Sequence, residues 1–189
     1  MSYIQVDDLS KQYGEGEAAV LAVRGINFGI ASGELIAIMG ESGSGKSTLL
    51  TVMGALNSPG RGKYWVDKID VYALGHEERA DFRRNYLGFV FQSFHLIPYL
   101  TVRENVMLPL TPVNIRKKEK RAMAEEALGR VGLAGKGGRL PSQISGGEQE
   151  RVAIARAMVN KPPILLADEP TGNLDTKNTR EMMNLLQQL

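Results

Sequence analysis

The sequence predicts an α/β fold whose core is a mainly parallel sheet, with a small antiparallel β subdomain at the N-terminus and an inserted α-helical subdomain. Three observations predict it. Residues 35–39 (LIAIM) form an apolar run bounded by glycines, which is typical of a strand buried on both faces of a parallel sheet. A glycine-rich loop and a helical apolar spacing follow this run directly. Two more short apolar runs, 86–91 and 164–167, are separated by a mostly helical stretch.

Composition indicates a soluble globular protein and narrows its partners. Of the 189 residues, 43% are hydrophobic and 23% charged, which suits one domain, two-lobed at most. The net charge is only +2, and the basic run 116–121 (RKKEKR) contains Glu119. The run therefore favours a solvated helix face over the alternative of a nucleic-acid or lipid-headgroup patch, and no nucleic-acid partner is expected. There is no cysteine for a disulfide or a thiolate metal site. No signal peptide and no run of about 20 apolar residues is expected, so a membrane role requires a partner.

The elements follow in chain order. Stretches 4–6 and 19–23 predict small antiparallel strands, and Leu49, Leu50, Met53 and Leu56 predict a helix after the run 35–39.

The helical subdomain is expected at 93–142. Thr101 and Glu104 form a capping box, Asn114 is expected to cap the next helix, and the glycines of 135–138 close the lobe. The core then comprises 1–92 and 143–189 of a single domain. The sequence stops inside a helical pattern, so a C-terminal part of the fold is expected to be missing.

A phosphate-binding loop is predicted where the run 35–39 meets the next helix. Residues 40–47 match G-x-x-x-x-G-K-[ST] in full, between a strand and a helix as the motif requires. Glycines let successive N–H groups face phosphate oxygens, and the helix adds its positive end. Lys46 is expected to reach the β- and γ-phosphates and Ser47 to ligate Mg²⁺. The alternative is an ordinary Gly/Ser turn. The predicted nucleotide contacts are Gly40, Glu41, Ser42, Gly43, Ser44, Gly45, Lys46, Ser47 and Thr48.

Two carboxylates end the run 164–167. Asp168 is placed to hold the magnesium shell, as the second acid does in phosphate-loop enzymes. Glu169, one residue further, is placed to orient the attacking water. By itself the pair could merely cap the residues that follow it.

The segment 144–157 (ISGGEQERVAIARA) predicts a second anion site. Ser145 and Glu148 form a capping box that opens a helix, and Ser145, Gly146 and Gly147 present a hydroxyl and bare amides at its positive end. The alternative is a well-capped amphipathic helix with no ligand. A chain with one nucleotide needs another source for the second anion, and a second subunit supplies one.

With these motifs in view, the sequence resembles the ATP-binding-cassette (ABC) family from Tyr3 to Leu189. The resemblance implies a RecA-like phosphate-loop core and ATP hydrolysis with Mg²⁺ inside a homodimer. It implies that Tyr13 stacks on adenine and that Gln92 reaches the metal beside Ser47 and Asp168.

The resemblance also implies roles across the dimer. Glu169, Gln92 and Lys46 carry catalysis, the signature residues bind the γ-phosphate of the opposite subunit, and Asp175 in the segment 173–175 crosses the interface. Two departures stand out. The signature reads Ile-Ser-Gly-Gly-Glu, and the switch histidine is absent because the only histidines, His76 and His95, lie upstream in loop-like surroundings and suit surface or packing roles.

Within the family, segments 89–110 and 167–175 look most like the ATPases of the lipoprotein-releasing and macrolide-export group. That resemblance implies a cytoplasmic subunit attached to the inner face of the plasma membrane through a permease. The loop 94–100 is apolar and is predicted to dock the permease near Gln92, although it could serve ordinary packing between lobes. A cell-division-type ATPase that signals without transport stays an alternative. A chromosome-organising ATPase is disfavoured because only a short helical segment separates loop and signature.

Overall fold

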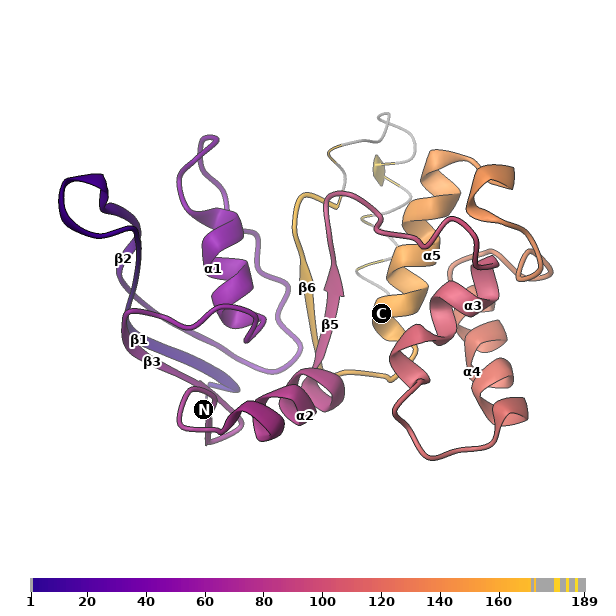
Figure 1. Ribbon diagram of the computed structural model, residues 1–189, viewed down its shortest axis with the longest axis horizontal. Coiled ribbons are helices and arrows are strands. Elements are labelled where there is room, and N and C mark those ends of the chain that lie inside the picture. Colours follow the sequence, from indigo (N-terminus) through magenta and orange to yellow (C-terminus); the bar gives the residue numbers. More distant parts are fainter. Residues whose placement is uncertain (1, 171, 173–178, 181–182, 184–185, 187–189) are drawn as a thin grey trace. The chain divides into compact units, whose positions relative to one another are not determined.

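The chain divides into two compact units after Arg83 in a computed structural model (Figure 1). The structure describes residues 2–170, 172, 179, 180, 183 and 186.

The first unit is built on a four-stranded antiparallel sheet of strand order β2-β1-β3-β4. Ile4 of β1 pairs with Ile30 of β2 on one side and with Val66 of β3 on the other. At the start of β1, Ile4 and Val6 are buried and Gln5 between them is exposed, as expected for a sheet with one covered face. The strands are β1 (Ile4–Tyr13), β2 (Val20–Ile30), β3 (Arg61–Val66) and β4 (Ile69–Asp70).

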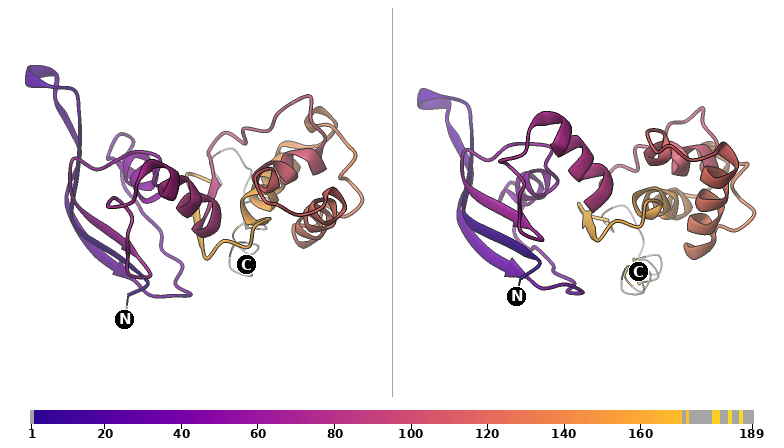
Figure 2. Two further views of the ribbon diagram at one scale, coloured as in Figure 1. Left: turned by 60° about the horizontal axis from the view of Figure 1, so that its bottom comes forward. Right: turned by 90° about the horizontal axis from the view of Figure 1, so that it is seen from below.

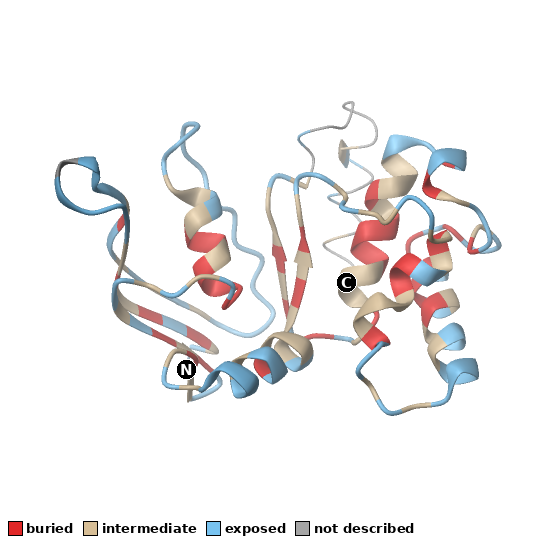
Figure 3. Ribbon diagram, in the orientation of Figure 1, coloured by how far each residue is buried: buried red, intermediate tan, exposed pale blue. Residues whose placement is uncertain are grey.

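One helix and the greater part of a second complete this unit. Helix α1 (Lys46–Met53) buries four apolar side chains, and α2 (His76–Tyr86) buries Phe82 (Figure 3). A short 3-10 turn, Gly16–Ala18, joins β1 to β2. The apolar residues of α1 that become buried are Leu49, Leu50, Val52 and Met53.

The second unit combines a parallel strand pair with a cluster of helices (Figure 2). Leu87 pairs with Ile164 and Val90 with Ala167, in register along both strands. The helices share one apolar core, to which α3, α4 and α5 all contribute. The elements are β5 (Leu87–Val90), α3 (Val102–Met107), a 3-10 turn (Leu108–Leu110), α4 (Lys117–Arg130), a 3-10 turn (Pro141–Gln143), α5 (Gly146–Met158) and β6 (Ile164–Ala167).

The architecture confirms the predicted α/β class, with an antiparallel N-terminal sheet, a parallel sheet and helices. Capping boxes at Thr101 and at Ser145 are present as predicted. Residues 116–119 and 121 of the basic run are exposed at the start of α4.

Three local predictions were wrong. Residues 35–39 form no strand, and the side chains of Leu35 and Met39 are exposed. Apolar character selects a strand only where a neighbouring strand supplies the hydrogen bonds, and no described strand of the first unit pairs with this run. Asn114 does not cap α4, since Arg116 occupies the N-cap position. His76 is not in a loop but is the first residue of α2.

No helix among the described residues is long and apolar enough to cross a membrane.

Candidate nucleotide site

The phosphate loop enters α1 through two glycines in left-handed backbone conformations. Gly43 has φ +78° and Gly45 has φ +93°, and Gly45 is the N-cap of α1. L-residues with a side chain rarely adopt these angles, so glycine is required here. A Cβ atom on Gly45 would lie 2.1 Å from the carbonyl oxygen of Ala22, so the loop presses against β2. The glycine therefore sets both the turn and the close approach of loop and sheet.

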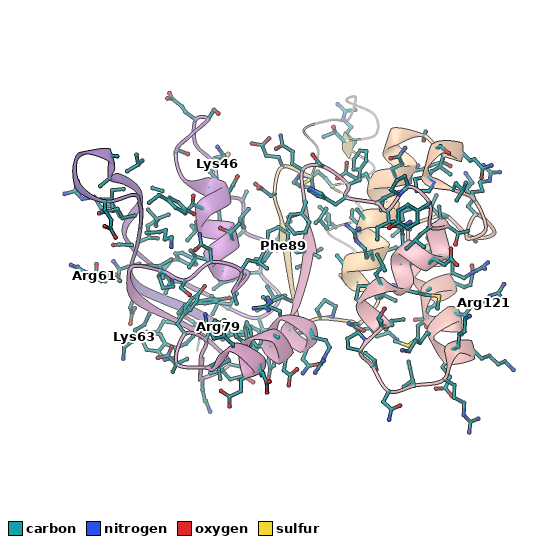
Figure 4. The ribbon with its side chains drawn as sticks, in the orientation of Figure 1. Lys46, Arg61, Lys63, Arg79, Phe89 and Arg121 are labelled. Atoms are coloured by element: carbon teal, nitrogen blue, oxygen red, sulfur yellow. The ribbon has the colours of Figure 1, made fainter. Side chains whose placement is uncertain are left out.

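Lys46 folds back over this loop. Its Nζ donates to the carbonyl oxygens of Gly40 and Glu41, both at 2.8 Å. Figure 4 shows the side chain at the start of α1, where the helix contributes positive charge. Two neutral carbonyl acceptors thus hold the ammonium at the mouth of the loop. A phosphate oxygen can replace them at a small cost in free energy, because both carbonyls are exposed and can bind water instead.

The other loop residues offer the groups that a nucleotide needs. Residues 41–44 and Ser47 are exposed, and Thr48 is half-buried in the first turn of α1. The Ser44 N–H donates to the carbonyl of Glu41 at 3.2 Å, which closes the tip of the loop. Amides and hydroxyls at a helix N-terminus are suited to a phosphate chain.

Tyr13 belongs to the same unit and approaches this loop through the sheet. It pairs with Val20 of β2, two residues before the Ala22 that touches Gly45. That spacing corresponds to roughly 7 Å along the strand. The ring is 43% exposed, Lys11 Nζ lies 5.2 Å from its centroid, and its hydroxyl accepts from Asn57 at 2.7 Å. An aromatic ring that is tethered at its hydroxyl but open on its surface can stack on a purine base.

The acidic residues lie in the second unit, after β6. The Asp168 N–H donates to the Val90 carbonyl at 2.9 Å, which extends the parallel pairing by one hydrogen bond. Glu169 then turns with φ +47°, an uncommon conformation for a residue with a side chain. Its carboxylate accepts from Gln92 Nε2 at 2.7 Å. Strained backbone of this kind costs about 1–3 kcal/mol and is concentrated at functional sites.

Gln92 and Glu169 are therefore brought together although 77 positions separate them in the chain. Both side chains are exposed, and Asp168 is half-buried beside them. The amide and carboxylate oxygens of this second unit are the hard donors that Mg²⁺ prefers. The described residues hold no cluster of three or more His, Cys, Asp or Glu residues that could hold a metal.

The signature residues begin α5. The Ser145 hydroxyl accepts from the Glu148 N–H at 3.3 Å, and Glu148 Oε2 accepts from the Ser145 N–H at 2.8 Å. Glu148 is also paired with Lys136, and this pair with the Ser145 amide lowers the pKa of Glu148 to about 2. Ser145 and Gly146 are exposed and Gly147 is half-buried. The exposed start of this helix is suited to an anion from outside the chain.

Of the predicted residues, Asp175 lies outside the described part of the chain. Sequence reasoning missed two residues that hold the loop after Gln92, namely Asn105 and Arg156. Asn105 is a polar residue with no exposed surface, next to the buried Val106. That mismatch was the available signal, because a buried polar group needs a specific partner.

Comparison with known proteins agrees with this geometry. The ABC transporter family model matches residues 23–172. The chain belongs to the ABC transporter family. The lipoprotein-releasing system ATP-binding protein LolD of Geobacter metallireducens is 49% identical over 188 residues, which is 100% of this chain and 84% of that protein. The macrolide export ATP-binding/permease protein MacB of Marinobacter nauticus is 46% identical over 98% of this chain and 29% of that protein.

Solved structures give the same result for the cassette. A dimeric structure of a bacterial ABC transporter cassette matches with a TM-score of 0.88 and 44% identity, covering 97% of this chain and 81% of that one. A post-hydrolysis dimer of such a cassette, bound to ADP and Pi, matches with a TM-score of 0.87 and 43% identity over the same shares. Over nearly its whole length the chain is thus similar to ABC transporter cassettes that form dimers.

Proposed function

We propose that this cassette binds Mg-ATP, closes on a second copy of itself and hydrolyses ATP to drive a membrane permease. The observation that carries the proposal is the hydrogen bond between Gln92 and Glu169 at the end of the β5–β6 pair. It holds a carboxylate in a fixed direction at a strand end, as a residue that orients water must be held. In this proposal residues 1–92 and 143–189 form the nucleotide-binding core of one domain, and 93–142 form its helical subdomain.

Each proposed nucleotide site takes residues from both copies. Lys46, the loop amides and Ser47 hold the phosphates, and Tyr13 stacks on the base. The Ser145 hydroxyl and the amides of Gly146 and Gly147 bind the γ-phosphate from the opposite copy, and Asp175 lies at the interface. This division explains why a capped, exposed helix start is kept in the same chain as a complete phosphate loop.

Catalysis rests on positioning and charge neutralisation rather than on covalent chemistry. The Glu169 carboxylate accepts a hydrogen bond from the attacking water. This hydrogen bond directs a lone pair of the water oxygen at the γ-phosphorus. Gln92 fixes the direction of that carboxylate through its Nε2. Ser47, Gln92 and Asp168 provide oxygen ligands for Mg²⁺, which when bound neutralises charge on the phosphates.

The permease is proposed to dock on the loop after Gln92. Tyr99 is 78% exposed, and Pro98 beside it is exposed as well. The loop is nevertheless well anchored: Asn105 Nδ2 donates to the carbonyls of Ile97, Leu100 and Thr101, each at 3.1 Å. An exposed aromatic ring on an anchored loop is suited to bind a helix of a partner, because the loop loses little conformational entropy on binding. The similarity to LolD and MacB favours lipoprotein release or macrolide export as the transported class.

The test combines ATP binding, ATP turnover and mass in solution. The wild-type chain is expected to bind Mg-ATP, dimerise with it and release phosphate. Glu169→Gln is expected to bind ATP, to remain dimeric in light scattering and to lose turnover. Glu77→Gln, an isosteric change in the exposed first turn of α2, is the matched control and keeps all three properties. A Glu169→Gln protein that hydrolyses ATP at the wild-type rate would refute the catalytic role, and one that stays monomeric at saturating ATP would refute closure.

A further inference from the structure

The loop that follows β5 is fastened to α5 by one arginine. Arg156 Nη1 donates to the His95 carbonyl at 2.6 Å, and its Nη2 donates to the Phe94 carbonyl at 2.8 Å. The two acceptors are consecutive, so the planar fork of the guanidinium fixes the orientation of the peptide as well as its position. Burial lowers the pKa of Arg156, so this group is a partly desolvated anchor rather than a surface charge.

Gln92 lies between this anchor and the sheet. Strand β5 ends at Val90, and the anchored carbonyls begin at Phe94, so only residues 91–93 lie between two fixed points. Phe91 stacks on Phe89 with 4.3 Å between ring centroids, and the His95 ring meets Phe91 edge-on at 5.2 Å. The backbone on both sides of Gln92 is therefore held, which fixes the point from which its side chain extends.

We infer that Arg156 is a positioning residue for ATP hydrolysis: it fixes the backbone that carries Gln92 and so holds the Gln92 amide against the Glu169 carboxylate. The inference rests on the proposed function, because that proposal assigns Gln92 and Glu169 to the reaction. The inference also connects two parts of the proposed site, because Arg156 lies on α5, the helix that begins with the signature residues. Ten residues separate Arg156 from Gly146, which is about 15 Å along α5. A rigid helix thus joins the signature to the loop of Gln92.

Asn105 provides the structural contrast. It is fully buried, and it binds residues 97–101 to α3. Removing Asn105 affects the stability of the loop, whereas removing Arg156 releases the part next to Gln92. The two anchors therefore separate a role in stability from a role in positioning.

The first test observes the Gln92 side chain directly, without turnover. In ¹⁵N-labelled protein, the side-chain amide signal of Gln92 is assigned by its loss in Gln92→Glu. Glu169→Ala gives the reference position of a broken hydrogen bond. Arg156→Met and Arg156→Lys are expected to move the signal toward that reference, since a lysine ammonium cannot reproduce the fork. Arg121→Met, at an exposed position on α4 marked in Figure 4, is the matched control and leaves the signal in place.

The second test is a kinetic double-mutant cycle. Arg156→Met is expected to lower kcat about 10-fold and to leave the KM for ATP within about 2-fold, because it disturbs orientation and not binding. In a Gln92→Ala background the same change is expected to lower kcat by less than about 2-fold, since the group on which it acts is gone. A merely structural role would give the same loss in both backgrounds.

The outcomes separate the two claims. If the Gln92 signal of folded Arg156→Lys stays at the wild-type position, the positioning role is overturned. Arg156→Lys is also the variant that decides the test if Arg156→Met does not fold. Equal losses of kcat in both backgrounds overturn it as well. A wild-type protein that binds ATP without hydrolysing it overturns the proposed function instead, while a shifted Gln92 signal still supports the anchoring of Gln92 by Arg156.

Discussion

Glu150 should make the stability of the second unit depend on pH near neutrality. It lies on α5 with only 2% of its surface exposed, and burial raises its pKa to about 7. The folded state therefore holds the proton more tightly than the unfolded state, whose glutamate ionises near its ordinary value of 4.5. The contribution of Glu150 to stability is therefore largest below that value, declines as the pH rises, and is fully lost above about pH 7.

The loss of stability can be calculated from the size of the pKa shift of Glu150. One pKa unit corresponds to about 1.4 kcal/mol, so the upper limit for Glu150 is about 3 kcal/mol. Relaxation and water entry around the carboxylate reduce such shifts, and we expect about 1–2 kcal/mol. Glu150→Gln has nearly the same shape and cannot ionise. It should stabilise the protein by that amount at about pH 8 and should change stability little at about pH 5.

Glu148, two residues earlier, is the internal control of opposite sign. Its pKa is lowered to about 2 by Lys136 and the Ser145 amide, so its contribution is present above pH 4.5 and is lost as the pH falls toward 2. Glu148→Gln should therefore destabilise the protein at neutral pH, by about 1 kcal/mol because the pair lies near solvent. The same substitution at both sites of one helix is thus expected to act in opposite directions.

The assay is urea unfolding of the three proteins at about pH 5 and about pH 8, followed by helix content. The decisive quantity is the change in unfolding free energy caused by the substitution at about pH 8 minus the same change at about pH 5. This difference removes any packing effect of the amide that is independent of pH. For Glu150→Gln that difference should correspond to a midpoint shift of roughly 2–8 °C in parallel thermal scans. An equal effect at both pH values would refute the reasoning, because a carboxylate that is ionised throughout has no proton to lose.

Three further predictions concern the loops. Lys46→Ala should weaken Mg-ATP binding in titration calorimetry at least about 10-fold, and unchanged affinity would contradict the phosphate-loop assignment. Gly45→Ala should destabilise the first unit by about 1 kcal/mol or more and weaken ATP binding, because its Cβ would overlap the Ala22 carbonyl; a folded variant with native affinity would contradict this. Asn105→Ala should lower stability by about 2–4 kcal/mol in urea unfolding and increase hydrogen exchange at 97–101, whereas protection at wild-type level would contradict its anchoring role.

Local signals along the chain predicted much of the fold. The capping boxes at Thr101 and Ser145 were predictable because each depends on two residues three positions apart, and both are present. The strand ending at Ala167 was predictable because an apolar run stops at two acids. Asn114 was misjudged because capping preference depends on residue type, whereas the actual helix start also depends on where the chain leaves the preceding turn. The run 35–39 was misjudged because pairing is a property of the neighbours.

The candidate site also has one part that the sequence could predict and one part that it could not. Phosphate-loop chemistry is local, so glycines 43 and 45 and Lys46 could be placed from spacing alone. The hydrogen bond between Gln92 and Glu169 joins residues 77 positions apart, and only the parallel pairing of β5 with β6 brings them together. Glu169 was placed from its position after the run 164–167, and Gln92 from the family resemblance, but neither gave a reason why one should hold the other.

Arg156 shows why such anchors escape sequence reasoning. In the run Val152–Ala157 it reads as one charged residue on an amphipathic helix, where a solvated arginine is the ordinary expectation. Its partners are two backbone carbonyls, which have no side-chain identity and leave no trace in composition or spacing. Loop carbonyls that are not paired within a sheet or helix still need donors, and a guanidinium can serve two at once. A half-buried arginine beside a loop that carries an active-site residue is therefore a reason to examine the loop backbone, because the arginine then constrains the reacting groups without touching the substrate.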